Sequence, residues 1–166
     1  MVFQGGALFD SMNVLENVGY ALVEHTDMGD EAIRERALEC LDMVGLGQDE
    51  PPDILDKFPA NLSGGMRKRV ALARSIAIKP AVILYDEPTT GLDPPNCDRI
   101  AMMIRDLQRR LNVTSIVVTH DIDTAFYVSD RMAMLHEKRF PWVAETEAFR
   151  EIEDDEVQDF IVRRTR

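Results

Sequence analysis

The amino-acid sequence predicts an α/β fold, in which a parallel β-sheet flanked by helices is joined to a helical subdomain. Residues 81–85 and 115–119 are short, continuously apolar segments, as is typical of strands in a parallel sheet. A helical segment, residues 94–111, separates them, so that strand, helix and strand form a βαβ unit. Before residue 81 the apolar residues instead recur with helical periodicity.

The helical subdomain is predicted over residues 12–80. Apolar residues recur at helical spacing in residues 13–24 and 30–44, and the second segment is followed by Gly45, which suits a C-terminal cap. A further helix is predicted from Ser63 to Ile78, because serine is a favourable N-cap residue and a long periodic stretch follows. We therefore expect a small helical unit ahead of the sheet.

The α/β core is predicted over residues 81–145. Because its two apolar strands show no regular polar alternation, both faces of each strand are expected to be buried. Asp93 suits the N-cap of the helix between them, and the two prolines that follow suit its first turn. Further strands are expected near residues 132–135 and Val143, and short helices within residues 146–166.

Composition indicates an ordinary globular protein, because 45% of the 166 residues are hydrophobic and 30% are charged. The net charge of −11 argues against binding to nucleic acid. Cys40 and Cys97 lie far apart without metal-binding spacing, so we interpret them as incidental thiols in a reducing compartment, the cytoplasm. We expect neither a membrane span nor a secretory signal.

The helix start at Ser63, Gly64 and Gly65 is a candidate anion site. Glycines let a ligand approach backbone N–H groups closely, and the positive end of the helix dipole favours a phosphate. A Ser-Gly-Gly helix start taken alone more often serves only as a cap. The motifs that follow it in the chain favour the functional interpretation.

Two adjacent carboxylates, Asp86 and Glu87, follow the first apolar strand. At the carboxyl end of a parallel strand, such a pair suits a Mg²⁺ ion and an attacking water, with the aspartate beside the metal and the glutamate beside the water. The alternative is that the two acidic residues simply begin a solvent-exposed loop and have no catalytic role. The segment from Pro88 to Asp93 follows at once and favours the functional interpretation.

His120 follows the second apolar strand, where ligands bind in open α/β sheets. A neutral imidazole there can donate to a phosphate or orient water. A lone histidine would favour a structural role, but this one belongs to an ordered set of motifs. His25 and His136 lack that context, and we interpret them as surface or packing residues.

The order and spacing of these motifs resemble the ATP-binding subunit of ABC transporters. Leu62–Met66 is similar to the ABC signature, Ala81–Glu87 to the Walker B strand with its catalytic glutamate, Gly91–Asp93 to the D-loop, His120 to the switch histidine, and Phe3-Gln4 to the Q-loop. The resemblance covers nearly the whole chain and implies a P-loop NTPase-like ABC ATPase core, with ATP and Mg²⁺ as cofactors.

The resemblance also implies roles for the matching residues. Glu87 and His120 would be catalytic, and Asp86 with Gln4 would hold Mg²⁺. The residues that would meet the nucleotide or its interface are Gln4, Ser63, Gly64, Gly65, Asp86 and Asp93. The glycine-rich signature would contact the γ-phosphate bound by a second protomer, and the D-loop aspartate would communicate across that dimer interface.

A finer resemblance is to the ATPases of MCE-associated, Mla-type lipid transporters. It rests on residues 4–12, 16–18 and 62–69 and on the ending near 154–161. It implies ATP-driven transmembrane transport of phospholipid or another lipid. The implied partners are a transmembrane permease, a second ABC ATPase protomer and an MCE-domain substrate-binding protein, at the cytoplasmic face of the inner membrane.

The chain departs from the family in one motif. ABC ATPases carry a P-loop, GxxxxGK[ST], upstream of the Q-loop, whereas no glycine here is followed by lysine. We therefore expect residues 1–166 to be a single partial domain without the P-loop and N-terminal strands, through fragmentation, gene truncation or a misplaced start codon. By resemblance, the absent strand would lie beside those ending at Asp86 and His120. Tight ATP binding by this chain alone is not expected.

Two alternatives were weighed against an active transport ATPase. The chain could be a non-catalytic partner that lends its signature to an intact ABC ATPase. A chromosome-organising or DNA-repair ATPase also carries a signature-like motif, but a long coiled coil then separates the two halves. Only a short helical unit without sustained heptads lies between Gln4 and Leu62, which argues against that class.

Overall fold

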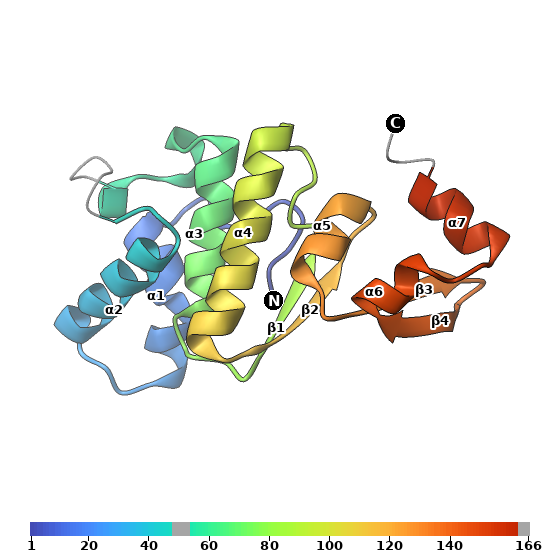
Figure 1. Cartoon of the computed structure of the whole chain (residues 1–166). Helices are drawn as coiled ribbons and strands as arrows, with labels where there is room; N and C mark the ends of the chain where they lie inside the picture. Colours follow the sequence, from blue (N-terminus) through green and yellow to red (C-terminus); the bar gives the residue numbers. More distant parts are fainter. Residues whose placement is uncertain (48–53, 163–166) are drawn as a thin grey trace. The chain divides into compact units, whose positions relative to one another are not determined.

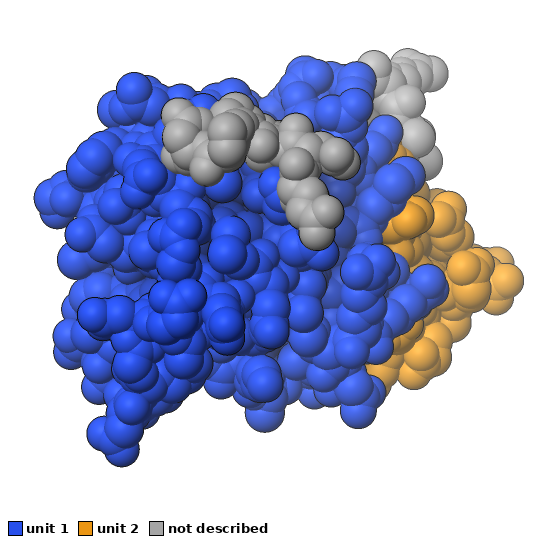
Figure 2. Space-filling view, turned by 90° about the vertical axis from the view of Figure 1, so that its left-hand side faces the viewer, with its two compact units in different colours: residues 1–118 blue, residues 119–166 orange. Residues whose placement is uncertain are grey.

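The computed structural model describes residues 1–47 and 54–162 (Figure 1). The chain divides into two compact units, residues 1–118 and residues 119–166, which Figure 2 colours separately. The first unit holds the helical subdomain and a parallel strand pair, and the second holds an antiparallel hairpin with short helices. The domain boundaries predicted at residues 80 and 145 stay predictions.

Three α-helices build the helical part of the first unit: α1 (Val14–His25), α2 (Asp30–Met43) and α3 (Gly64–Ile76), with the short 3-10 helices η1 (Ile54–Asp56) and η2 (Pro59–Asn61). All three α-helices were predicted, although α3 ends before Ile78. α1 begins with a capping box, because Asn13 and Glu16 each accept from the other's backbone N–H. Gly45 follows α2 with φ +65°, as its predicted capping role requires.

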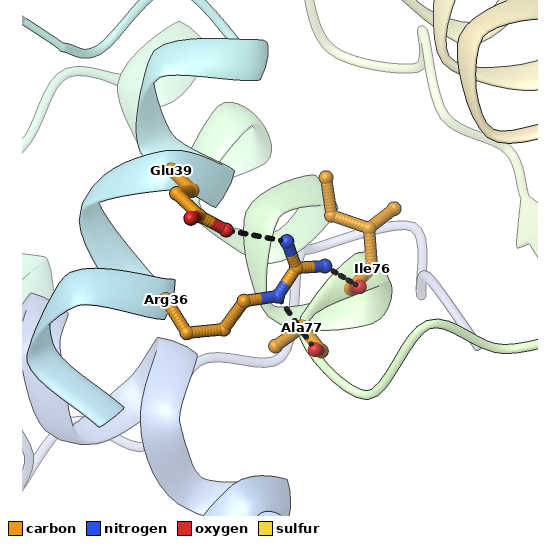
Figure 3. A network of polar contacts seen from close by, with 4 residues as sticks. All are labelled: Arg36, Glu39, Ile76 and Ala77. Atoms are coloured by element: carbon orange, nitrogen blue, oxygen red, sulfur yellow. Dashed lines mark hydrogen bonds and ion pairs between the residues drawn. The ribbon is translucent and has the colours of Figure 1, made fainter. Parts of the chain in front are cut away.

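Arg36 of α2 is buried and ties this helix to the C-terminal end of α3 (Figure 3). Its Nε donates to the Ala77 carbonyl oxygen at 3.0 Å, and its Nη2 donates to that of Ile76 at 2.9 Å. Its Nη1 pairs with Glu39 at 2.9 Å. The guanidinium thus satisfies carbonyl groups that a helix end leaves without intrahelical partners.

The strands β1 (Val82–Asp86) and β2 (Thr114–Val118) pair in parallel, with Asp86 opposite Val118, and α4 (Pro94–Leu111) connects them. This βαβ unit confirms the prediction. Val2 lies on the other side of β1: its N–H donates to Leu84 O at 2.7 Å, and it accepts from Asp86 N–H at 2.8 Å. In the described residues β1 thus has a neighbour at each edge, so the expectation that the absent strand lies directly beside β1 is wrong, whereas the outer edge of β2 has no strand partner.

The prediction that both faces of these strands are buried is wrong for this chain. Tyr85 is only 1% exposed and Ile83 likewise, so one face lies in the core. The other face is apolar but open, and its exposed side chains are Val82 at 49%, Leu84 at 42%, Ile116 at 52% and Val118 at 59%. The physical reason is that a sheet face is buried only where another layer covers it, whatever its own residues are.

The second unit contains α5 (Ile122–Val128), β3 (Arg131–His136), β4 (Arg139–Glu145), α6 (Thr146–Arg150) and α7 (Asp155–Val162). The strands predicted near residues 132–135 and Val143 are β3 and β4, which form an antiparallel hairpin. The short helices predicted near the C-terminus are α6 and α7. The seven-residue α5 was not predicted; Asp121 caps it by accepting from the Thr124 N–H at 3.3 Å.

Cys40 is buried and Cys97 is half-buried, as predicted, and neither forms a disulfide within the described residues. Within residues 1–47 and 54–162, no helix combines the length and apolarity that a bilayer crossing requires.

Candidate functional site

The segment that carries Gln4 lies alongside the end of β1. The backbone hydrogen bonds of Val2 hold it next to Leu84 and Asp86, and Gln4 follows two residues later. The Q-loop-like segment and the carboxylate pair therefore share one edge of the sheet, as parallel strands that end together require. Gln4 itself is exposed.

Asp86 and Glu87 occupy different backbone conformations at this edge. Asp86 is the last residue of β1 and half-buried, whereas Glu87 has φ +47°, in the left-handed region that non-glycine residues seldom adopt. The Glu87 N–H donates to the Val118 carbonyl oxygen at 2.9 Å, and Oγ1 of Thr90 donates to its carboxylate at 2.9 Å. The turn after β1 therefore fixes both the backbone and the carboxylate of Glu87.

The tip of α3 has the predicted geometry. Oγ of Ser63 accepts a hydrogen bond from the Met66 N–H at 3.2 Å, which confirms the N-cap. Ser63 and Gly64 are exposed and Gly65 is half-buried. A Cβ at Gly65 would lie 3.9 Å from Oδ1 of Asn96 in the first turn of α4, so the two helix starts are close together.

Asp93 takes the N-cap position of α4, with prolines in the first turn as predicted. Its carboxylate does not cap a backbone N–H, however, and instead accepts from the Asn96 side-chain amide at 2.6 Å. Asp93 therefore lies at the predicted N-cap position, but its side chain does not make the capping hydrogen bond. The carboxylate is exposed beside the tip of α3.

Lys68 links these parts, and sequence reasoning missed it. Its Nζ donates to the Gln4 carbonyl oxygen at 3.0 Å and to the Pro88 carbonyl oxygen at 2.7 Å. Burial lowers the pKa of Lys68, while Cys97 and Glu87 act in the opposite direction. The sequence does show a basic segment, residues 67–69, directly after the signature-like motif. It does not show which distant residues Lys68 would contact.

A second missed network holds the loop between Gln4 and α1. Asn17 is fully buried; its Oδ1 accepts from the Phe9 N–H at 2.9 Å, and its Nδ2 donates to the Phe9 carbonyl oxygen at 3.1 Å. Arg74 of α3 donates to the Gly6 carbonyl oxygen at 2.8 Å, and its guanidinium lies 5.5 Å from the Phe9 ring centroid. α3 therefore contacts this loop at two places, through Lys68 and Arg74.

His120 belongs to the second unit, is exposed, and follows the end of β2 by two residues. Its role beside Glu87 stays a prediction. His25 ends α1 on the surface, and His136 pairs with Glu156 at 3.0 Å and packs against Trp142, as expected of surface or packing residues.

The residues at the sheet edge fit a Mg²⁺ ion. The Asp86 carboxylate is half-buried and has no hydrogen bond or ion pair with the part of the chain that is described. Gln4 would offer an amide oxygen from the adjacent segment. Within residues 1–47 and 54–162 no cluster of three metal-binding side chains occurs. Mg²⁺ is commonly held by one or two carboxylates together with water and substrate phosphates, so the Asp86 carboxylate is a suitable ligand.

Comparison with known proteins identifies relatives over almost the entire chain. The chain is 39% identical over 161 residues to the "Probable ribonucleotide transport ATP-binding protein mkl" of Mycobacterium leprae, covering 97% of this chain and 45% of that protein. It is 36% identical over 161 residues to the "Intermembrane phospholipid transport system ATP-binding protein MlaF" of Escherichia coli, covering 97% and 58%. This chain thus spans about half the length of these relatives.

A solved structure shares the fold. The chain superposes with a TM-score of 0.74 and 35% identity on the ATP-binding cassette MJ0796, described as a dimeric post-hydrolysis state bound to ADP and Pi, covering 87% of this chain and 61% of that one. The family described as "ABC transporter" matches residues 1–90, more than half of the chain. This match and the relatives show that the chain belongs to the ABC transporter family.

Proposed function

We propose that this chain forms part of the ATP-binding, ATP-hydrolysing subunit of an ABC transporter. The observation that carries the proposal is the juxtaposition at one sheet edge of the Gln4 segment and the Asp86–Glu87 pair, both joined by Lys68 to the helix that begins at Ser63. The M. leprae and E. coli relatives described above are both named as transport ATP-binding proteins.

In this proposal Glu87 is the catalytic base. Its carboxylate would orient the attacking water and accept its proton, and the turn that fixes Glu87 limits the positions that carboxylate can take. His120 would donate a hydrogen bond to the γ-phosphate. Asp86 and Gln4 would hold Mg²⁺, which supplies charge neutralisation on the phosphates when bound.

Tight ATP binding also needs a P-loop, which these 166 residues do not contain. The open apolar face of β1 and β2 and the open edge of β2 support completion by a P-loop-bearing strand and its helix. Such a segment would pair with β2 and cover Val82, Leu84 and Ile116, which are 42–52% exposed.

The active assembly in this proposal is a head-to-tail dimer. Ser63, Gly64 and Gly65 would approach the phosphate held by the partner protomer, because the α3 tip presents N–H donors at an exposed position. Asp93 lies beside that tip and would contact the same interface. The solved relative is described as dimeric with ADP and Pi.

The transported substrate is proposed to be phospholipid or another lipid. Support comes from the intermembrane phospholipid transport relative, whose identity of 36% extends over 97% of this chain. A transmembrane permease and an MCE-domain protein are the proposed partners, at the cytoplasmic face of the inner membrane. Other relatives are named for different cargo, including "Fe(3+) ions import" in a Rhizobium meliloti protein 47% identical over 135 residues, so neighbouring genes must decide the substrate class.

A groove between α1 and α2 is the proposed contact for the permease. It encloses about 370 Å³ and is mainly apolar, lined by Leu15, Tyr20, Val23 and Ile33. The lining also includes three carboxylates, from Glu16, Glu24 and Asp30. An apolar groove with an acidic lining fits a short amphipathic helix whose polar face is basic, and this is the occupant we propose.

The catalytic proposal is tested by joining this chain behind the P-loop-bearing N-terminal segment of the E. coli phospholipid-transport relative. The joined protein should hydrolyse ATP only with Mg²⁺, and Glu87→Gln should abolish turnover. The matched control is Glu35→Gln, an exposed carboxylate on α2. Unchanged turnover in the Glu87 variant would discard the catalytic assignment.

A non-catalytic role is the second candidate. The complete and exposed α3 tip is the observation in its favour, because it could serve the ATP site of an intact ABC ATPase. A pull-down with an intact paralogue and an ATPase assay of the pair separate the two functions. Failure to associate would dismiss the partner role.

A further inference from the structure

One cationic side chain joins three segments that the proposed mechanism treats separately. Nζ of Lys68 reaches the Gln4 carbonyl oxygen, 64 positions away in sequence, and the Pro88 carbonyl oxygen, 20 positions away. Lys68 itself lies in the second turn of α3. The ammonium group thus connects the Q-loop-like segment, the residue directly after the candidate base, and the signature-like helix.

The environment of Lys68 differs from that of a solvated surface lysine. The side chain is half-buried, Pro88 is buried, and the two bonds at 2.7 and 3.0 Å use two of the three ammonium donors. The neighbouring Arg69 provides a contrast on the same helix. It makes one exposed bond, of 3.3 Å, to the Gly45 carbonyl oxygen, on the side of the helical subdomain.

The segments that Lys68 joins are also held by other bonds, and Arg74 of α3 donates to the Gly6 carbonyl oxygen at 2.8 Å, but Lys68 is bonded to both segments. The Gln4 segment is anchored to β1 through Val2, and the turn at Glu87 is anchored to β2 through the Val118 carbonyl oxygen. Both anchors lie in the sheet, whereas Lys68 attaches both segments to α3. A charged donor shared between two carbonyl groups is a strong interaction, of the charge-assisted class.

We propose that Lys68 is a positioning residue, which holds the Gln4 segment and the turn carrying Glu87 in fixed register with the signature-like helix. The catalytic consequence rests on the proposed function, since Gln4 and Glu87 act on the nucleotide only if this chain serves an ATP site. The structural consequence does not: removing the ammonium removes one bond to α3 from each segment at once, in this chain by itself.

Amide hydrogen exchange, followed by NMR on the chain as it stands, tests the structural part. The reporters are the Gly6 N–H, bonded to Phe3 O at 2.8 Å, and the Thr90 N–H, bonded to Glu87 O at 3.3 Å. Lys68→Met should accelerate exchange at both by about tenfold, the change expected from losing a charged hydrogen bond. Arg69→Met should leave both within about twofold.

Two outcomes would overturn the proposal. One is unchanged exchange at Gly6 and Thr90 in a folded Lys68→Met protein. The other is an equal acceleration throughout α1, which would make Lys68 a contributor to global stability alone. Lys68→Arg, which retains a charged donor, should restore protection at both amides, and it keeps the test decisive if the methionine variant does not fold.

The catalytic part is tested in the joined ATPase described above. Lys68→Met should lower kcat by about tenfold with KM for ATP within about twofold, because the P-loop that binds ATP stays in place while Gln4 and Glu87 lose their positions. Lys68→Arg should recover most of kcat. A raised KM at unchanged kcat would overturn the positioning role. Turnover that survives Glu87→Gln would instead reject the proposed function, and the exchange experiment would still decide the role of Lys68.

Discussion

Replacing Arg36 with methionine tests whether α2 holds the C-terminal end of α3. Arg36 is only 8% exposed, and its guanidinium donates to the carbonyl oxygens of Ile76 and Ala77. Methionine is apolar, so the buried Ala77 oxygen loses its donor at about 1–3 kcal/mol, whereas the Ile76 oxygen loses one of two donors and keeps the Lys79 N–H at 3.0 Å. The lost positive charge at the helix end adds about 0.3–1 kcal/mol. The free energy of unfolding should therefore fall by about 3 kcal/mol, a large share of the ~5–15 kcal/mol that stabilises a domain.

Urea denaturation followed by circular dichroism measures the decrease in the free energy of unfolding. Two further variants separate the contributions of the charge and of the individual bonds. Arg36→Lys retains the charge without the planar fork and should lose about half as much. Glu39→Gln breaks only the ion pair to a carboxylate whose side chain is 62% exposed, and should cost below about 1 kcal/mol. A loss below about 1 kcal/mol for Arg36→Met, or an equal loss for Glu39→Gln, would refute the reasoning.

Two more predictions concern the buried phenol and the α1–α2 groove. Burial raises the pKa of Tyr85 from 10.0 to about 12, against a smaller lowering by Ser115, so the unfolded phenol ionises first as pH rises. The free energy of unfolding should therefore decrease by about 3 kcal/mol as pH rises from 10 through 12. Urea denaturation at each pH measures this decrease, and Tyr85→Phe should abolish the part that is due to the phenol. Glu24→Lys should weaken binding of a labelled leucine–lysine amphipathic helix several-fold in low-salt fluorescence anisotropy, whereas Asp106→Lys on α4 should not; equal effects would refute the acidic groove as its site.

Local signals predicted most elements of this fold. The N-cap serine and glycines of α3, the aspartate and prolines that start α4, and the two apolar strands each determine structure through contacts within a few residues. The seven-residue helix α5 was missed, although its N-cap aspartate, Asp121, is a signal that the sequence shows.

Tertiary contacts limited the prediction of the site. The motifs predicted the positions of Asp86, Glu87 and the α3 tip, because each follows directly from a strand end or a helix start. Lys68 makes its two bonds to residues 64 and 20 positions away, and no local pattern encodes such partners. The exposed sheet face was missed for the same reason: apolar sequence predicts that a face can be buried, but the covering layer is a property of the whole assembly.

α3 is the element through which the parts of the first unit depend on one another. Its tip is the signature-like motif, its second turn carries Lys68, and its C-terminal end is held by Arg36 of α2. α2 in turn lines the groove proposed for the permease, through Asp30 and Ile33. A force applied at that groove therefore has a continuous path of named bonds to the Gln4 segment and the Glu87 turn. On the proposed function, nucleotide state and permease position would depend on each other through this path to the extent that α3 moves as a rigid body.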